Sequence, residues 1–164
     1  MHLTVRPLAI GGAALALLAC GVEPAAPAFD ARHAGLALRL DIQPAAIAPG
    51  DSFFVRLVLR NVGLQPADLV SGCSIPSFFT FTGPAGEVGP APGYGCYTVI
   101  TKFTIASGDS LVQAHRMFAR DAMQHGEPPF ESGTYRVETA WNIQHLPVLR
   151  RQLTVLEGPA PQTH

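Results

Sequence analysis

Two segments of the chain alternate apolar and polar residues with a period of two. Their apolar members are Leu36, Leu38, Leu40 and Ile42 in the first and Phe53, Val55, Leu57 and Leu59 in the second. Successive side chains of a β-strand point to opposite faces, so this spacing indicates two strands that each bury one face. A sheet with one apolar face needs a second layer to cover it. The pattern therefore favours two packed sheets.

The rest of the chain continues the strand pattern, and Gly- and Pro-rich turns separate the segments. Further strands are predicted over 77–82, 97–105, 111–118, 132–143 and 148–156, and a short apolar pair stands at 69–70. Helical periodicity is almost absent, although one helical turn at 118–124 fits the sequence, and the segment 83–95 is predicted to be a loop. Together these features predict an all-β, immunoglobulin-like antiparallel β-sandwich of about seven strands.

Tyr135 follows a Gly-Thr turn at the start of the penultimate predicted strand. Immunoglobulin-like folds often place a tyrosine corner there, with the hydroxyl bound to nearby backbone. The alternative is a tyrosine at the edge of the core with no special role. The sequence favours neither.

The N-terminus has a charged start, an apolar core from Leu8 to Leu18 and a small residue at Ala19, which is the order of a secretory signal. The core is shorter than the about 20 apolar residues that a membrane-spanning helix needs. Leu17-Leu18-Ala19-Cys20 resembles the lipobox of bacterial lipoproteins. The resemblance implies cleavage before Cys20, acyl chains on that residue, and stable anchoring because more than one chain is attached. Gly21 in place of Asp implies the outer membrane where the cell has one. The alternative is an ordinary secreted protein in which Cys20 is incidental.

This interpretation divides the chain into a signal peptide (1–19), a flexible tether (20–35), the β-sandwich (36–157) and a disordered tail (158–164). The complete chain has 11 basic and 12 acidic residues. Removal of 1–19 takes away Arg6 and no acid, so 10 basic residues remain against 12 acidic ones, a net charge of −2. That balance excludes a nucleic-acid partner. The expected partners are the membrane, through the lipid, and an envelope protein.

With Cys20 lipidated, Cys73 and Cys96 remain, and an exported pair tends to form a disulfide. Such a bond would stabilise the fold by roughly 3 to 4 kcal/mol. The alternatives are a metal site and a catalytic thiol, but no second ligand stands at metal spacing from either cysteine.

The sequence contains none of the common catalytic or nucleotide-binding motifs, and we predict neither enzyme activity, nor a cofactor, nor a metal. Ser107, Asp109 and Ser110 could form a nucleophile cluster with His115 if the fold brought them together. We expect instead that residues 107–110 form a turn between two strands, in which Ser and Asp bind their own backbone. His115, His125 and His145 have no partners at ligand spacing. We expect them at the surface, and the alternative is a histidine site assembled by the fold.

The predicted loop 83–95 is a candidate contact surface, because Cys96 would hold its end and Tyr94 and Tyr97 would supply aromatic anchors. The alternative is a solvated loop without a partner. Trp141 alternates with Tyr135 and Val137, which favours the core over an exposed ligand platform.

Four segments together resemble the BsuPI-type proteinase inhibitor domain. They are VRLVLRNVG (55–63), LVSGCSIPSFFTFTGPAGEVG (69–89), SGDS (107–110) and SGTYRVETAW (132–141). The resemblance covers about 100 residues and implies an immunoglobulin-like fold and protease inhibition. This chain departs from the pattern at Cys73, at Cys96 after a longer loop, and in lacking a Trp after Gly86. The sequence therefore predicts a lipid-anchored, non-enzymatic envelope protein that binds proteins or envelope components, with a surface-presented proteinase inhibitor as the alternative.

Overall fold

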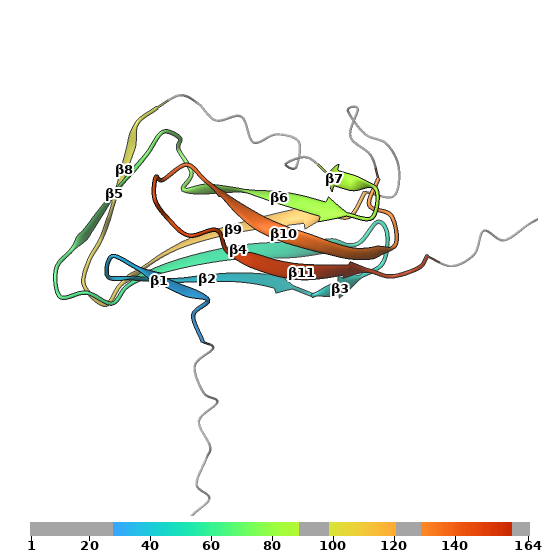
Figure 1. The fold of residues 1–164 in the computed structure, drawn as a ribbon, viewed down its shortest axis with the longest axis horizontal. Helices are drawn as coiled ribbons and strands as arrows, with labels where there is room; N and C mark the ends of the chain where they lie inside the picture. The colour runs from blue at the N-terminus through green and yellow to red at the C-terminus, as the bar shows by residue number, and fades with distance from the viewer. Residues whose placement is uncertain (1–27, 89–98, 121–128, 159–164) are drawn as a thin grey trace, which may run out of the picture.

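The structure is a computed structural model that describes residues 28–88, 99–120 and 129–158. These residues form strands and no helix (Figure 1). The strands are β1 (Ala31–His33), β2 (Leu36–Gln43), β3 (Ala46–Ile47), β4 (Ser52–Asn61), β5 (Ala67–Ser71), β6 (Ser77–Gly83), β7 (Gly86–Val88), β8 (Thr101–Ile105), β9 (Ser110–Phe118), β10 (Gly133–Trp141) and β11 (Arg150–Val155).

Two sheets form the body of the molecule. The first has the strand order β1-β2-β4-β9, and the second has the order β3-β11-β10-β6-β7. Their strand pairs are antiparallel except for β3, which pairs with β11 in parallel. The chain thus passes from the first sheet to the second between β2 and β3. The predicted all-β, immunoglobulin-like sandwich is confirmed.

The core lies between the two sheets and contains the residues that the alternation selected. Leu38, Leu40, Phe53, Val55, Leu57, Leu59, Phe81, Tyr135 and Val137 are all fully buried. Phe53 and Phe81 pack edge to face with ring centroids 5.9 Å apart, and Phe130 packs against both. Edge-to-face packing places the positive edge of one ring on the negative face of the next. These aromatic side chains therefore fill the space between the two sheets and help to set the distance between them.

Tyr135 forms a tyrosine corner. Its ring is buried against Phe130, and its hydroxyl donates a hydrogen bond of 3.0 Å to the carbonyl of Glu131. Burial raises the pKa of the phenol above its ordinary value, and the nearby Glu131 carboxylate adds to the rise while the hydrogen bond opposes it. Of the two alternatives that the sequence left open, the corner is the one present.

Strands β5 and β8 pair with each other and, among the described residues, belong to neither sheet, so they form a two-stranded arm at one end of the sandwich (Figure 1). Asn61, at the end of β4, fixes the base of this arm. Its side-chain nitrogen donates to the carbonyls of Gln65 (2.8 Å) and Ile105 (2.9 Å), and its side-chain oxygen accepts from the amide of Gly63 (2.9 Å). Asn61 is 1% exposed, so these bonds satisfy its buried amide. They also join β4 to the start of β5 and to the end of β8, which lie together at the base of the arm.

The structure corrects two boundaries. The segment 83–95, expected to be a loop, begins as a tight hairpin in which β7 pairs with β6. The pairing of Phe81 with Val88 buries Val88, a single apolar residue that gave no alternation in a Gly- and Pro-rich stretch. Pairing also starts before Leu36, because β1 lies inside the segment expected to be a tether. β1 is a short edge strand, and its residues have no apolar period.

The other local expectations fall partly outside the described residues. β9 ends at Phe118, and neither Ala119 nor Arg120 is helical. The remainder of the expected helical turn at 118–124 lies outside the described residues, as do the signal peptide and most of the C-terminal tail.

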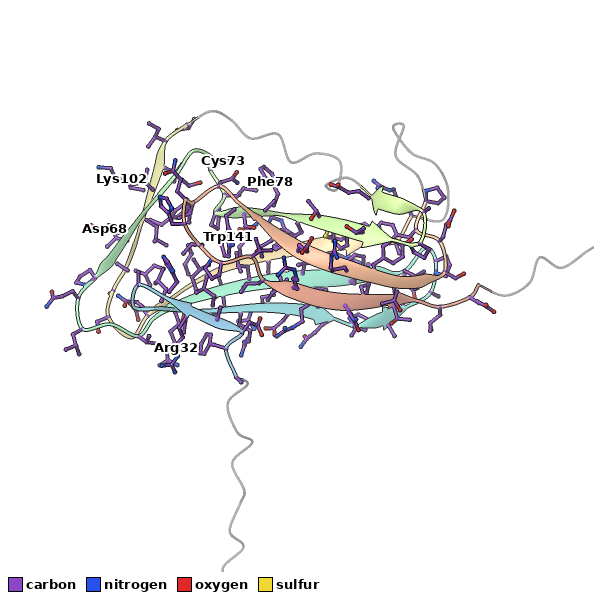
Figure 2. The ribbon with its side chains drawn as sticks, in the orientation of Figure 1. Arg32, Asp68, Cys73, Phe78, Lys102 and Trp141 are labelled. Carbon is purple, nitrogen blue, oxygen red and sulfur yellow. The ribbon has the colours of Figure 1, made fainter. Side chains whose placement is uncertain are left out.

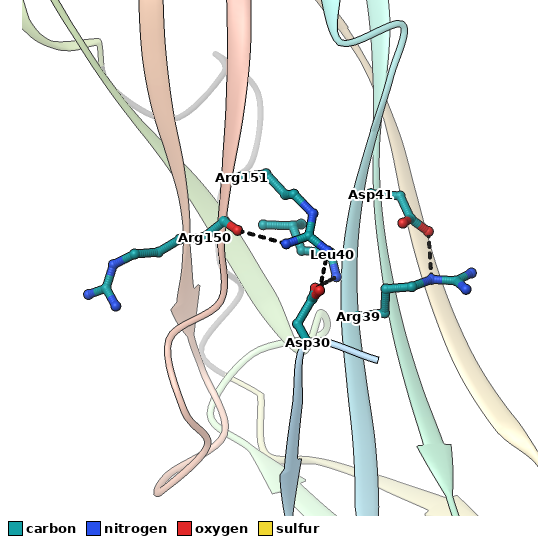
Figure 3. Close-up of polar contacts among 6 residues, drawn as sticks. All are labelled: Asp30, Arg39, Leu40, Asp41, Arg150 and Arg151. Carbon is teal, nitrogen blue, oxygen red and sulfur yellow. Dashed lines mark hydrogen bonds and ion pairs between the residues drawn. The ribbon is translucent and has the colours of Figure 1, made fainter. Parts of the chain in front are cut away.

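Asp30 fixes the described N-terminal segment at the seam between the sheets (Figure 3). Its carboxylate accepts a 2.7 Å hydrogen bond from the amide of Leu40 in β2 and pairs with Arg151 in β11. Its own amide donates to the carbonyl of Leu38 (2.8 Å). One residue therefore ties the chain to both sheets before β1 begins.

Candidate functional site

The arm is a separate two-stranded sheet, and its two faces differ in what they contact. Its inner face carries Ala67 and Leu69, which pack against the core, and the buried Ile105. Its outer face carries Asp68, Val70, Lys102 and Thr104, and Figure 2 shows Asp68 and Lys102 on the arm. The hydroxyl of Thr104 donates to the Asp68 carboxylate at 2.7 Å. The alternation of the two strands thus leaves one full face of the arm in solvent.

A hollow of about 520 Å³ lies beside β5. It is lined by β5 residues from Asp68 to Ser71, by Gly72, by Ile100, and by the connection from Asn142 to Gln144. Val70 is 53% exposed and Ile100 is 76% exposed at this hollow, and the neighbouring Val99 is 55% exposed. An exposed aliphatic cluster beside a hollow is typical of a binding surface.

A second hollow, of about 420 Å³, lies along the other side of the arm. It is lined by Lys102 to Ala106 and by Asp109 to Leu111. Each hollow lies beside the outer edge of one strand of the arm. Within the described residues, β8 pairs only with β5, and β5 makes one further backbone contact, the bridge from Ser71 to Ile143. Unpaired backbone groups at a strand edge can accept an additional extended strand. The arm therefore offers apolar side chains and backbone hydrogen-bonding groups together.

Few of the described residues that line the two hollows carry titratable side chains. The titratable groups at the two hollows are Asp68, Lys102 and Asp109, and no histidine or cysteine lines either one. The part of the chain that the structure describes contains no group of three His, Cys, Asp or Glu residues placed to hold a metal. Among the described residues, His115 and Tyr135 have a shifted pKa, and neither lines one of these hollows.

Most residues that the sequence selected for a site lie outside the described residues. Cys20, Tyr94, Cys96 and Tyr97 are in this group. Cys73 is described: it is 1% exposed and lies where the chain passes from β5 to β6, beside the arm (Figure 2). Its amide donates to the hydroxyl of Ser71 at 3.1 Å. The bond between Cys73 and Cys96 stays a prediction.

The expectation of surface histidines is wrong for His115. His115 lies in β9 on the side that faces the core, and its ring packs edge to face with Phe79 of the opposite sheet at 5.9 Å. Burial lowers its pKa below 6.5. The inward residues of β9 include the polar Gln113 and His115, whereas the apolar Val112 and Phe118 are exposed. The hydrophobic pattern of this strand therefore did not predict that His115 faces the core. His145 is exposed, as expected, and His125 lies outside the described residues.

The predicted turn at 107–110 is confirmed. The amide of Asp109 donates to the carbonyl of Ala106 at 3.1 Å, and Gly108 has φ +81°, which glycine adopts without strain. The hydroxyl of Ser107 donates to the Gly63 carbonyl at 2.7 Å. The hydroxyl of Ser107 and the backbone amide of Asp109 thus both bind backbone carbonyls.

Trp141 lies between the two alternatives considered for it. It packs against the core but remains partly accessible, and its indole nitrogen donates to the carbonyl of Pro147 at 2.8 Å. The next residue in the chain, Asn142, lines the hollow beside β5. Trp141 thus supports the connection from β10 that forms one wall of that hollow.

No protein-family model and no curated protein matches the chain. Solved structures with a similar chain path include the alkylpurine DNA glycosylase AlkC of Pseudomonas fluorescens, with 16% identity over 74% of this chain and a TM-score of 0.46. The b-glucosidase EmGH1 of Erythrobacter marinus has 13% identity over 74% of this chain and a TM-score of 0.45. The CARDB domain of the PF1109 protein of Pyrococcus furiosus has 11% identity over 77% of this chain and a TM-score of 0.40.

The chain corresponds to different shares of these proteins. It spans 31% of the glycosylase and 16% of the glucosidase, but 100% of the CARDB domain. At this level of similarity, the activities of these proteins cannot be assigned to this chain. Among the described residues, no helix is both long and apolar enough to cross a membrane.

Proposed function

We propose that this chain is a lipid-anchored extracytoplasmic protein whose immunoglobulin-like domain binds an extended polypeptide segment at the arm, without catalysing a reaction. The signal-like N-terminus and the resemblance of residues 17–20 to a lipobox support export and anchoring at Cys20. The observation that carries the binding function is the arm itself. Two strand edges, the exposed side chains of Val70 and Ile100, and a hollow of about 520 Å³ meet there.

An extended segment suits this surface better than a small molecule does. The hollows lie open along the arm, and a ligand strand would pair with backbone groups while alternate side chains contact Val70 or Ile100. In this proposal Tyr94 and Tyr97 lie on the segment leading into β8 and provide additional contacts. The disulfide between Cys73 and Cys96 would hold that segment to the start of β6.

The test of binding is site-specific photo-crosslinking in intact cells. A photoreactive residue at position 70 should capture a reproducible envelope protein. The matched control is position 156, because Leu156 is 49% exposed and follows β11 at the opposite end of the sandwich, whereas Val70 is 53% exposed. Equal capture from both positions, or none from position 70, would contradict the proposal.

Anchoring has a separate test. The intact mass of the protein extracted from membranes, measured with and without reductant, reports the lipid on Cys20 and the state of Cys73 and Cys96. A full-length chain recovered uncut from the cytosol would remove both the anchor and the disulfide from the proposal.

Protease inhibition is the second candidate function. The residues that carry the BsuPI resemblance include Asn61, Gly108 and Tyr135, which form the base of the arm, a turn and the tyrosine corner. They therefore support the fold more than an inhibitory loop. Titration of the purified domain against serine and metalloproteases separates the two functions, because only an inhibitor would reduce their activity, and a Val70→Glu variant would locate the contact.

A further inference from the structure

We propose that the outer face of the sheet β1-β2-β4-β9 docks onto anionic phospholipid headgroups, so that the domain lies with this sheet against the membrane. The inference rests on the lipid anchor of the proposed function, and it concerns a different surface from the arm. We call this surface the arginine face. Its basic residues are Arg32, Arg39, Arg56, Arg60 and Arg116.

The strand register places these arginines on one side of the sheet. Residues directly opposite each other in paired strands point to the same face. Arg56 pairs with Asp41 on one side and with Ala114 on the other, and Arg60 pairs with Ala37 and Ser110. The remaining pairs on this face join Arg32 to Ala37, Arg39 to Val58, and Arg116 to Phe54. Arg32 points away from the body in Figure 2.

The charge of this face is unlike that of the rest of the domain. Asp41 is the one acid among the outward residues of β1, β2, β4 and β9, so five arginines face one carboxylate. On the outer face of the opposite sheet, Arg136 and Arg150 both pair with Glu138, and Glu87 adds a second acid. The complete chain has a net charge of −1, so the positive charge is concentrated rather than general.

Several of these charges are available to a ligand. Arg39 pairs with Asp41 at 2.9 Å, but within the described residues Arg32, Arg56 and Arg60 form no ion pair. Arg116 donates to the hydroxyl of Ser52 at 3.1 Å and lies over the ring of Phe118. Guanidinium groups bind phosphate oxygens through paired hydrogen bonds, which suits them to phospholipid headgroups.

Apolar side chains stand among the arginines. Phe54 is 50% exposed, Phe118 is 56% exposed and Val112 is 45% exposed on the same face. A hollow of about 160 Å³ opens between Asp41, Gln43, Phe54, Arg56 and Ala114. Aromatic and basic side chains on one flat surface are typical of segments that lie in the membrane interface.

The path of the chain selects the membrane over an acidic protein as the occupant. Arg39 lies over the ring of Phe29, with 5.8 Å between the guanidinium carbon and the ring centroid, so the described chain begins at the arginine face. The connection from Cys20 to Phe29 spans at most about 30 Å even when fully extended. The anchor would therefore hold this face close to lipid headgroups, where even weak binding is effective because the local concentration is high.

The test uses the mature polypeptide without its lipid, residues 21–164, so that the anchor cannot cause binding. Flotation with vesicles containing phosphatidylglycerol should recover the protein at low salt, and added salt should release it. Vesicles of phosphatidylcholine alone should recover little. The double variant Arg56→Gln/Arg60→Gln should lower the partition coefficient by about 25-fold, at about fivefold for each arginine.

The matched control is Arg136→Gln/Arg150→Gln, which removes the same charge from the opposite sheet. It should leave the partition coefficient unchanged, and circular dichroism checks that both variants are folded. An equal loss in both variants, equal binding to the two kinds of vesicle, or no binding to the anionic vesicles would overturn the proposal. None of these outcomes depends on the lipid at Cys20, whose absence the intact mass would report separately.

Discussion

Gly83 and Tyr135 show how one residue can depend on the absence of a side chain in another. A Cβ atom at position 83 would lie 2.2 Å from Cε1 of Tyr135 and within 2.6 Å of two further ring atoms. The ring cannot move away easily, because it packs against Phe130 and its hydroxyl is bound to the Glu131 carbonyl. Glycine at position 83 is therefore required by the tyrosine corner.

We expect Gly83→Ala to lower the free energy of unfolding by about 1 to 3 kcal/mol, which is the usual cost of inserting atoms into a packed core. Urea denaturation measures the loss. Gly72→Ala is the matched control, since a Cβ there meets no atom within 4 Å. A stability loss in the control as large as that of Gly83→Ala would show that the clash with Tyr135 is not the cause.

At the scale of an element, the arm depends on the side-chain hydrogen bonds of Asn61. Removal of the amide leaves the carbonyls of Gln65 and Ile105 without the donor that now binds them. We expect Asn61→Ala to destabilise the domain by about 1 to 3 kcal/mol, because the buried carbonyl of Ile105 would be left unsatisfied. Hydrogen exchange should increase first in β5 and β8, because the residue joins them to the sandwich.

The control for Asn61 is Thr104→Val, which removes an exposed hydrogen bond to Asp68 on the outer face of the arm. Its stability should change by less than about 0.5 kcal/mol. If exchange in Asn61→Ala increased equally in β2 and β10, the residue would support the whole domain rather than the arm.

The strands that the sequence predicted well are those in which one face is apolar throughout. β2 and β4 belong to this class, and so does β6, whose Phe79 and Phe81 face the core as expected. In β10, Tyr135 and Val137 are buried, and the tyrosine corner could be named as one of two alternatives from the turn that precedes it.

The missed features are those that depend on pairing between distant segments. Residues 69–70 were recognised as an apolar pair, yet nothing local indicates that β5 leaves both sheets to pair with β8. The exposed cluster at the arm also needs Ile100 and the connection from Asn142, which only the fold brings together. In the sequence, Arg56 and Arg60 alternate with apolar residues such as Val55, Leu57 and Leu59, but the extent of the arginine face follows only from the register of four strands.

At the scale of the whole molecule, the two sheets are joined by polar contacts as well as by the apolar core. Gln113 of β9 reaches across to β6, where its side-chain nitrogen donates to the Ser77 carbonyl (2.7 Å) and its oxygen accepts from the Ser77 amide (3.3 Å). These two bonds fix the orientation of the amide. The same nitrogen lies 2.5 Å from Nε2 of His115, so it donates there and the histidine nitrogen must accept.

This geometry requires a neutral His115, in agreement with the lowering of its pKa by burial. A protonated ring would place an N–H group against the amide N–H of Gln113. Acid should therefore weaken the junction of the two sheets.

The direction of the pH dependence follows from proton binding. The pKa of His115 is below 6.5 in the folded chain, so near and below that pH the unfolded chain binds more protons. The contribution of His115 to stability is fully present above pH 6.5 and falls as the pH decreases toward the folded pKa. Urea midpoints measured between about pH 7.5 and about pH 5 should fall in the native protein, and this fall should be smaller in His115→Gln, which cannot titrate. His33→Gln removes an exposed histidine from β1 and should keep the native pH dependence. If His33→Gln flattened the curve as much as His115→Gln, the pH response would belong to the surface charge and not to the contact between the sheets.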